Sequence, residues 1–403
     1  MHQRTVGPVG ALLLVSALSL SACDTQGGAV ASSGTKTAVI GVMAPLTGEV
    51  SEFGLGIQHS VELAVSQANA SNALPGWRLK VEARDDKGKP SVGKKVATAF
   101  AAEADVAGVV GNLNSGVSQS SQPVLAAANI VQVSPSNTNP TLTRGANFAT
   151  DPVRPFASYF RTCTTDNYQG PFAARYLIGK AGIRKVATLH DKTTYGQGVV
   201  QAFTEEFTKL GGTVVATGTI NPEKPNFTPF ISKLRSTRPS VVYYGGQYPQ
   251  AGKLAALMSS ASLKIKLMAA DAVYNPKYIT LAGASASGDL ATNVGAPTSH
   301  LAAGQKFLAD YDAAGYKEPS AAYGGYSFDA ANAIINALKE SLKDAKDVVS
   351  ARKATIEALG NTSFNGVTGK VDFDQYGDSV THMLTIYQVT GAKWVPISTE
   401  FVM

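Results

Sequence analysis

Two loops of the sequence combine hydroxyl groups with backbone N–H groups that can bind an anion. Residues 111–116 read Gly-Asn-Leu-Asn-Ser-Gly before a helical stretch, and residues 134–138 read Ser-Pro-Ser-Asn-Thr after the next apolar run. A helix N-terminus presents free N–H groups and a partial positive charge, which favour a carboxylate. Because Ser, Thr and Asn are also common helix caps, either loop alone favours simple capping. The two loops together favour an anion site.

Three further polar side chains are suited to the rest of a small ligand. Tyr195, Gln247 and Asp271 each follow a short apolar run that predicts a strand. In open α/β sheets, ligands bind outside the carboxyl ends of the strands. Asp271 can therefore hold an ammonium group opposite the anion site. The alternative is that Asp271 caps another helix or lies on the surface.

Motifs for enzymatic chemistry fail here at their essential residues. Residues 88–94 match the spacing of a phosphate-binding loop, but Lys95 stands where Ser or Thr should ligate magnesium. The five histidines are scattered and form no zinc-binding pair. The two cysteines, Cys23 and Cys163, exclude a disulfide framework and a Cys-rich metal site. We expect no catalytic residue, no cofactor and no bound metal.

The elements that must position these loops alternate between strands and helices. Short apolar runs predict strands at 38–43, 79–83, 106–110, 130–133, 186–189, 214–215, 241–244 and 265–268. Helical stripes with apolar residues three and four positions apart lie between them. This order is typical of parallel sheets with crossover helices. A loop at 134–155, rich in Pro, Asn and Thr, interrupts it. The sequence therefore predicts an α/β protein with two doubly wound parallel-sheet lobes.

The N-terminal segment is typical of a bacterial lipoprotein. Residues 1–22 contain Arg4 and an apolar stretch too short to span a bilayer, which together predict a signal peptide. Leu20-Ser21-Ala22-Cys23 resembles the lipobox, in which the cysteine thiol carries a diacylglycerol. We expect cleavage before Cys23 and a flexible tether over residues 23–37. The alternative is an ordinary signal peptide followed by an unrelated cysteine.

The composition indicates a folded chain with a sizeable core. Of its 403 residues, 44% are hydrophobic and 16% are charged. The net charge of +6 is spread thinly, which excludes the clustered basic patch of a nucleic-acid-binding protein. With Cys23 lipidated, Cys163 has no partner. We expect Cys163 to be a buried, small apolar side chain, with a reactive thiol as the alternative.

Several ordered segments resemble the leucine/isoleucine/valine-binding protein family, the substrate-binding components of bacterial ABC importers for branched-chain amino acids. These segments are 39–48, 85–86, 135–138, 190–196, 242–246 and 364–369. The resemblance covers residues 39–395 and implies a two-lobed clamshell with a three-segment hinge, the type I periplasmic-binding fold. It places lobe 1 at 38–164 plus 295–383 and lobe 2 at 165–294 plus 384–403.

The resemblance also implies the roles of individual residues. The ligand carboxylate is expected to meet Ser115 and Thr138, with help from backbone groups of Ser136 and Asn137. The ammonium is expected to meet Asp271, with Phe53 and Tyr195 beside it. Gln247 stands where the branched-chain prototypes have an aromatic residue, so either Gln247 or Tyr248 walls the pocket. Residues 149–158 look inserted relative to the family, and a cysteine pair that some members bridge is absent.

Together these features predict a solute receptor, lipid-anchored at Cys23, on the outer face of the cytoplasmic membrane (extracytoplasmic or periplasmic). We expect a monomer that binds an amino acid, a branched-chain one by resemblance, and delivers it to the permease subunits of an ABC importer. We expect no nucleic-acid partner and no membrane attachment besides the lipid. The alternatives are a sensory subunit or receptor for an amide or urea-like solute on the same fold, and a secreted hydrolase, for which we find no activated nucleophile.

Overall fold

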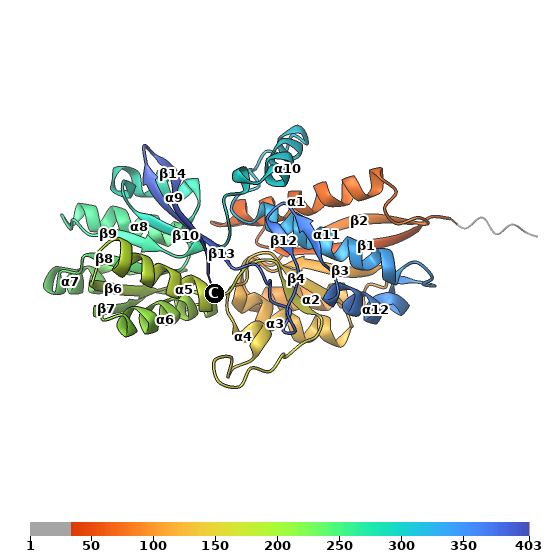
Figure 1. Cartoon of the computed structure of the whole chain (residues 1–403), viewed down its shortest axis with the longest axis horizontal. Coiled ribbons are helices and arrows are strands. Elements are labelled where there is room, and N and C mark those ends of the chain that lie inside the picture. Colours follow the sequence, from red (N-terminus) through yellow and green to blue (C-terminus); the bar gives the residue numbers. More distant parts are fainter. Residues whose placement is uncertain (1–33, 403) are drawn as a thin grey trace, which may run out of the picture. The chain divides into compact units, whose positions relative to one another are not determined.

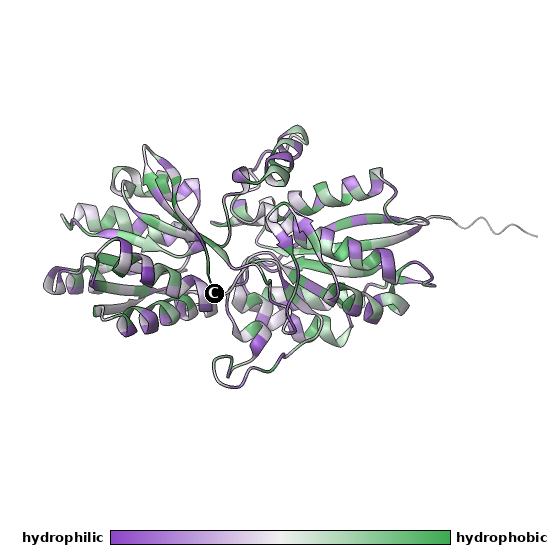
Figure 2. Ribbon diagram, in the orientation of Figure 1, coloured by the Kyte–Doolittle hydropathy of each residue, from purple (hydrophilic) through white to green (hydrophobic). Residues whose placement is uncertain are grey.

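The computed structural model describes residues 34–402 and contains two large sheets, each flanked by helices (Figure 1). The expected signal peptide and Cys23 lie outside the described residues. The hydrophobic residues are concentrated in the strands, as Figure 2 shows. Within residues 34–402, no helix combines the length and the apolar character needed to cross a membrane.

The first sheet has five parallel strands in the order β2-β1-β3-β4-β5. They are β1 (Lys36–Ala44), β2 (Trp77–Asp85), β3 (Val106–Gly111), β4 (Val131–Ser134) and β5 (Tyr159–Arg161). We call this sheet and its helices the first lobe. The helices are α1 (Ser51–Ala70), α2 (Pro90–Ala102), α3 (Ser115–Ala127), α4 (Thr141–Arg144), α10 (Ala302–Ala313), α11 (Gly324–Ser341) and α12 (Val348–Gly360).

Alternate residues of β1 show why helices cover both faces of this sheet. Val39 and Met43 belong to one apolar cluster, which includes Phe100 of α2. Ile40 and Val42 belong to another, which contains side chains of α1 and α11. Successive strand residues point to opposite faces, and here both sets are buried. The continuous apolar run in the sequence therefore corresponds to a strand buried on both sides.

The second sheet has seven strands in the order β14-β13-β10-β9-β8-β6-β7. They are β6 (Lys185–His190), β7 (Thr213–Thr219), β8 (Val241–Gly245), β9 (Lys266–Ala269), β10 (Leu290–Asn293), β13 (Met383–Thr390) and β14 (Lys393–Phe401). β6 to β10 pair in parallel, whereas β13 and β14 are antiparallel additions. We call this sheet and its helices the second lobe. The helices are α5 (Asp166–Arg175), α6 (Thr194–Lys209), α7 (Thr228–Thr237), α8 (Tyr248–Ser260) and α9 (Pro276–Ala282).

The chain passes between the two sheets three times. The passages lie between β5 and α5, between β10 and α10, and between the small hairpin β11 (Phe364–Gly366)–β12 (Gly369–Val371) and β13. The first and third passages are tied together by Arg161, which is fully buried and whose Nε lies 2.8 Å from Asp378 Oδ1. Burial alone would raise the pKa of Asp378, but Arg161 and Arg144 lower it, so this carboxylate stays ionised beside the passages.

The segment expected to be an insertion, residues 149–158, forms no helix or strand. Arg154 holds it against the first lobe by donating hydrogen bonds to the carbonyls of Ala157, Tyr159 and Gln375. The apolar runs up to residue 268 are confirmed as strands. The sequence pattern did not predict β10, β13, β14 or α10 to α12.

Candidate functional site

A small cavity lies where the strand ends of the two sheets face one another. Its walls are Phe53, Leu113, Asn114, Ser115, Ser136, Tyr195, Gln247, Asp271, Ala272 and Tyr323. Leu113 to Ser115 and Ser136 follow β3 and β4 of the first lobe, whereas Tyr195, Gln247 and Asp271 follow β6, β8 and β9 of the second. The free space is about 20 Å³, enough for about one water molecule. The two lobes are therefore closed over this cavity.

Asp271 lies at the centre of the hydrogen bonds around the cavity. Its side chain is buried, and its two oxygens accept hydrogen bonds from the hydroxyls of Tyr195 and Tyr323, each at 2.7 Å. Its backbone N–H donates to Gln169 Oε1 at 2.9 Å, and the Ala272 N–H donates to the Tyr195 hydroxyl at 3.2 Å. Tyr195 comes from the second lobe and Tyr323 from the first, so Asp271 joins the two lobes.

The electrostatics of this carboxylate favour a positively charged ligand. Burial raises the pKa of Asp271, while the hydrogen bonds from Tyr323 and Tyr195 partly oppose the increase. Asp271 is the only charged side chain among the described residues that line the cavity. A buried carboxylate without a cationic partner is costly, and an ammonium group placed beside it would stabilise its ionised form.

The first turn of α3 lines the same cavity. Ser115 is the first residue of α3, and its side chain is 2% exposed. The N–H groups of Val117 and Ser118 donate to Asn114 O, whereas those of Ser115 and Gly116 have no acceptor within residues 34–402. Such N–H groups at the start of a helix attract an anion. The Ser115 hydroxyl lines the same wall and adds a further donor.

The segment after β4 lies partly in the wall and partly behind it. Ser136 lines the cavity, and its hydroxyl donates to Leu113 O at 3.1 Å. Asn137 turns away from the cavity: its amide donates to Leu113 O at 2.7 Å and accepts from the Tyr159 hydroxyl at 2.9 Å. Thr138 is fully buried, and its hydroxyl has no partner among the described residues. In this closed form, therefore, neither Asn137 nor Thr138 lines the cavity.

Gln247 lines the cavity, and its neighbour Tyr248 does not. Tyr248 packs edge-on against Phe53, with ring centroids 5.4 Å apart, and donates to Glu49 O at 2.5 Å. Tyr323 also lines the cavity, although it was not among the residues expected from the sequence, and its ring packs on Phe53 with centroids 5.1 Å apart. The one sequence signal was an aromatic residue followed by Gly324 and Gly325 at the start of an amphipathic helix. That pattern does not reveal a hydroxyl directed at Asp271.

Two glutamates of the first lobe hold the cavity closed from one side. Glu49 Oε1 lies 3.0 Å from Lys253 Nζ of α8. Glu52, which is buried in the first turn of α1, lies 2.7 Å from Lys277 Nζ of α9 and accepts a hydrogen bond from Asn275. Both acids belong to the first lobe and all their partners to the second. These contacts can form only when the lobes are close together.

Cys163 is a buried apolar side chain, as the sequence indicated. It is fully buried, its Sγ lies 3.4 Å from Asn137 O, and burial raises the pKa of its thiol, which disfavours a reactive thiolate. Within residues 34–402, no cluster of three or more His, Cys, Asp or Glu side chains could hold a metal ion.

Comparison with known proteins places this architecture in a family. The model of the periplasmic binding protein family matches residues 37–393. The Leu/Ile/Val-binding protein homolog 2 of Brucella abortus (strain 2308) is 32% identical over 352 residues, which cover 87% of this chain and 90% of that protein.

Solved structures share the fold. The branched-chain amino acid transporter substrate-binding protein LivJ of Streptococcus pneumoniae, in complex with isoleucine, has a TM-score of 0.79 and 24% identity over 91% of this chain and 99% of that chain. A solute-binding protein of an ABC transporter from R. palustris, in complex with benzoate, has a TM-score of 0.78 and 21% identity over 91% and 97%. Both of these structural neighbours are substrate-binding or solute-binding proteins of transporters. With a family match over nearly all described residues and a two-lobed α/β clamshell, the chain belongs to the periplasmic binding protein family and is related to the Leu/Ile/Val-binding proteins.

Proposed function

We propose that this protein captures an amino acid between its two lobes and delivers it, chemically unchanged, to an ABC importer. The observation that carries the proposal is the buried Asp271 carboxylate, which has two tyrosine hydroxyls but no cation beside it. The ammonium group of a zwitterion would pair with Asp271. Its carboxylate would meet the Ser115 hydroxyl and the free N–H groups at the start of α3.

A branched-chain side chain is the best match for the remaining walls. Phe53, Leu113 and Ala272 contribute apolar surface, and Asn114 and Gln247 are the amides that line the cavity. The B. abortus relative is named for leucine, isoleucine and valine, and the S. pneumoniae protein was solved with isoleucine. These names support the assignment by similarity.

Capture requires the lobes to open and close. A space of about 20 Å³ admits no amino acid, so the ligand enters an open form and favours the closed one. Only in the closed form do groups of both lobes reach the ligand. The contacts of Glu49 and Glu52 across the lobes add to the stability of that form. The transporter would then recognise the closed shape.

An aromatic acid is the second candidate ligand. Phe53, Tyr195 and Tyr323 surround the cavity with aromatic rings, and one structural neighbour holds benzoate. Benzoate, however, brings no ammonium group. It would leave Asp271 unpaired, at a cost of several kcal/mol if that carboxylate stays ionised. An amino acid therefore fits the cavity better.

Calorimetry with three ligands tests the assignment. The purified protein is titrated with isoleucine, with N-acetyl-isoleucine, which lacks the ammonium, and with benzoate. We expect isoleucine to bind at least about 30-fold more tightly than either of the others, because about 2–5 kcal/mol depends on a buried charge pair. Benzoate binding as tightly as isoleucine, or binding of N-acetyl-isoleucine equal to that of isoleucine, would refute an amino-acid site.

The proposal includes anchoring outside the cytoplasm through a lipid on Cys23. Leu20 to Cys23 match a lipobox, and the family supplies substrate-binding proteins to transporters. Stable anchoring needs two or more acyl chains, so the lipidated cysteine should dominate attachment. We expect Cys23→Ala to release the protein from membranes or to block its maturation. A Cys23→Ala protein that remains membrane-bound after a salt wash would contradict the anchor without affecting the ligand assignment.

A further inference from the structure

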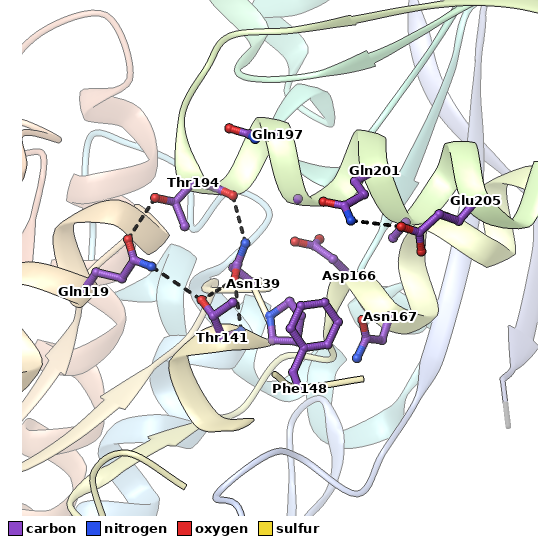
Figure 3. A pocket seen from close by; sticks show the side chains of 13 residues that line it. Gln119, Asn139, Thr141, Phe148, Asp166, Asn167, Thr194, Gln197, Gln201 and Glu205 are labelled. Atoms are coloured by element: carbon purple, nitrogen blue, oxygen red, sulfur yellow. Dashed lines mark hydrogen bonds between the residues drawn. The ribbon is translucent and has the colours of Figure 1, made fainter. Parts of the chain in front are cut away.

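A second and larger cavity lies beside α5 and α6 (Figure 3). Its volume is about 270 Å³. We call it the α5–α6 cavity. The first lobe contributes Gln119, Asn139, Pro140, Thr141 and Phe148, and the second lobe contributes Asp166, Asn167, Thr194, Gln197, Gly198, Gln201, Ala202 and Glu205. The central cavity shares none of these residues.

The walls of the α5–α6 cavity are acidic and rich in amides. They contain two carboxylates, five side-chain amides and two threonine hydroxyls, and no Lys, Arg or His is among the described residues that line it. Asp166 and Asn139 are buried, whereas Gln197, Gln201 and Glu205 are exposed at the mouth. The Phe148 ring forms an apolar side of the same space (Figure 3). The cavity thus has a buried acidic floor and an open, polar mouth.

Asp166, at the floor, has no cationic partner among the described residues that line the cavity. Its side chain is 1% exposed, and its Oδ2 has no hydrogen-bond partner among the described residues. Its Oδ1 receives only a long hydrogen bond, 3.4 Å, from Gln169 Nε2. Figure 3 shows the carboxylate directed into the space between Asn139 and Gln201. Buried carboxylates are normally paired or fully hydrogen-bonded, so this one needs a cation or a proton.

The nearest guanidinium is occupied elsewhere. Arg161 donates from Nη1 to the carbonyls of Asn137 and Asn139, donates from Nη2 to Thr143, and holds its Nε beside Asp378. Burial, and next the charge of Asp271, raise the pKa of Asp166 to about 8, while Thr138, Arg161 and Gln169 oppose the increase. Burial therefore favours the protonated form of Asp166 when no cation is bound.

We propose that the α5–α6 cavity binds a small organic cation, an alkylammonium or guanidinium compound, with the charged group at Asp166, the alkyl part along Phe148 and any second charge at Glu205. Ammonium and guanidinium groups bring several N–H donors, and the amide oxygens of Asn167, Gln197 and Gln201 in the cavity walls can accept them. The Phe148 ring offers the alkyl part an apolar surface to pack against. A metal ion fits less well, because no three ligating side chains gather within residues 34–402.

The occupant would contact both lobes. Asn139 donates to Thr194 O at 2.8 Å and Thr194 donates to Gln119 Oε1 at 3.0 Å, so the two sides of the α5–α6 cavity already meet across the lobes (Figure 3). A cation that bridges Asp166 and Phe148 would join the same two lobes. The proposal does not rest on the identity of the ligand in the central cavity.

Titration of the full mature protein with putrescine, and with uncharged 1,4-butanediol as its control, tests the proposal. We expect putrescine to bind and butanediol not to bind. At a pH about one unit below the pKa of Asp166, binding should release close to one proton, because the cation favours the ionised carboxylate. Proton release is measured by calorimetry in two buffers of different ionisation enthalpy. A merely structural role for Asp166 would not produce it.

Three variants sharpen the test. Asp166→Asn should weaken putrescine binding at least tenfold and abolish the proton release. Glu205→Gln, an exposed site that leaves the fold intact, should weaken binding severalfold. Asp344→Asn, an exposed acid outside the cavity, should change nothing. The proposal would be overturned if putrescine did not bind, or if putrescine and butanediol bound equally. It would also be overturned if Glu205→Gln and a folded Asp166→Asn both bound putrescine as tightly as the parent protein.

Discussion

Replacement of Asp271 by Asn removes the charge of the central cavity but keeps the size of the side chain. If the ligand is a zwitterion, its ammonium is then buried without a partner. Loss of one member of a buried charge pair costs about 2–5 kcal/mol, which corresponds to a loss of affinity of about 30- to 4,000-fold. The two tyrosine hydrogen bonds to Asp271, each 2.7 Å long, place this carboxylate firmly enough for the upper half of that range.

Ser115→Ala is the matched comparison at the other end of the ligand. It removes one hydroxyl, while the free N–H groups of Ser115 and Gly116 remain. A single neutral hydrogen bond contributes about 0.5–1.5 kcal/mol, so the affinity should fall only about 2- to 13-fold. The comparison therefore predicts a clear order: Asp271→Asn weakens isoleucine binding more than Ser115→Ala does.

Stability separates a binding effect from a folding effect. Burial raises the pKa of Asp271 above that of the unfolded chain, so the ionised form at neutral pH costs the unliganded fold stability. Asn removes that cost but loses one tyrosine hydrogen bond. We expect the free energy of unfolding to change by no more than about 1 kcal/mol. The assay is calorimetric titration with isoleucine, paired with thermal unfolding of the unliganded proteins. Equal losses of affinity in the two variants, or an Asp271→Asn protein that binds like the parent, would refute the head-group assignment.

Three further predictions concern specificity, closure and pH. Gln247→Tyr should shift the ratio of affinities toward isoleucine over glutamine by about 2- to 13-fold, since a ring restores apolar contact; an unchanged ratio would mean that Gln247 does not touch the ligand side chain. Glu52→Gln should lower ligand affinity about 2- to 5-fold at low salt, and less at high salt, because the ion pair with the half-exposed Lys277 is lost. Calorimetric titration at two salt concentrations tests this prediction, and a loss of affinity that does not depend on salt would contradict it. Burial raises the pKa of Asp289 to about 6, so its contribution to stability is present below its unfolded pKa and is lost as the pH rises through 6. Asp289→Asn should therefore raise the free energy of unfolding at pH 7 by about 1–3 kcal/mol and flatten its dependence on pH. The hydrogen bond to Tyr278 can be kept, because the tyrosine hydroxyl can accept from the introduced amide where it now donates to the carboxylate. A variant that is less stable than the parent protein at pH 7 would refute this prediction.

Much of the fold followed from local sequence patterns. The apolar run at 106–110 and the Gly-Asn-Leu-Asn-Ser-Gly loop after it predicted a strand, a turn and a helix start, and β3 and α3 occupy those positions. The later elements were harder to predict. β13 contains four consecutive buried residues, whereas the edge strand β14 alternates between exposed and half-buried ones. The chain reaches these positions in the second sheet only after a long excursion through the first lobe. Which sheet a strand joins depends on contacts between distant segments.

The site shows the same division. Six residues expected there, Phe53, Ser115, Ser136, Tyr195, Gln247 and Asp271, line the central cavity. Asn137 and Thr138 lie in the same loop but do not line the cavity, and the Asn137 amide is bound by Leu113 and Tyr159 instead. A loop sequence specifies the residue types that it presents. The direction of each side chain depends on the neighbours that the fold supplies.

By itself, then, the sequence determined the α/β class, the strand ends that carry polar loops, and an acid facing a helix start, because apolar periodicity and turn residues act over a few positions. Only the tertiary structure decided that Tyr323, 52 positions from Asp271, donates to that acid, and that Glu49 and Glu52 meet lysines more than two hundred positions away. It also decided that Asp166 lies unpaired at the floor of a second cavity. Burial and hydrogen bonding between distant elements arise from packing, and no local pattern encodes them.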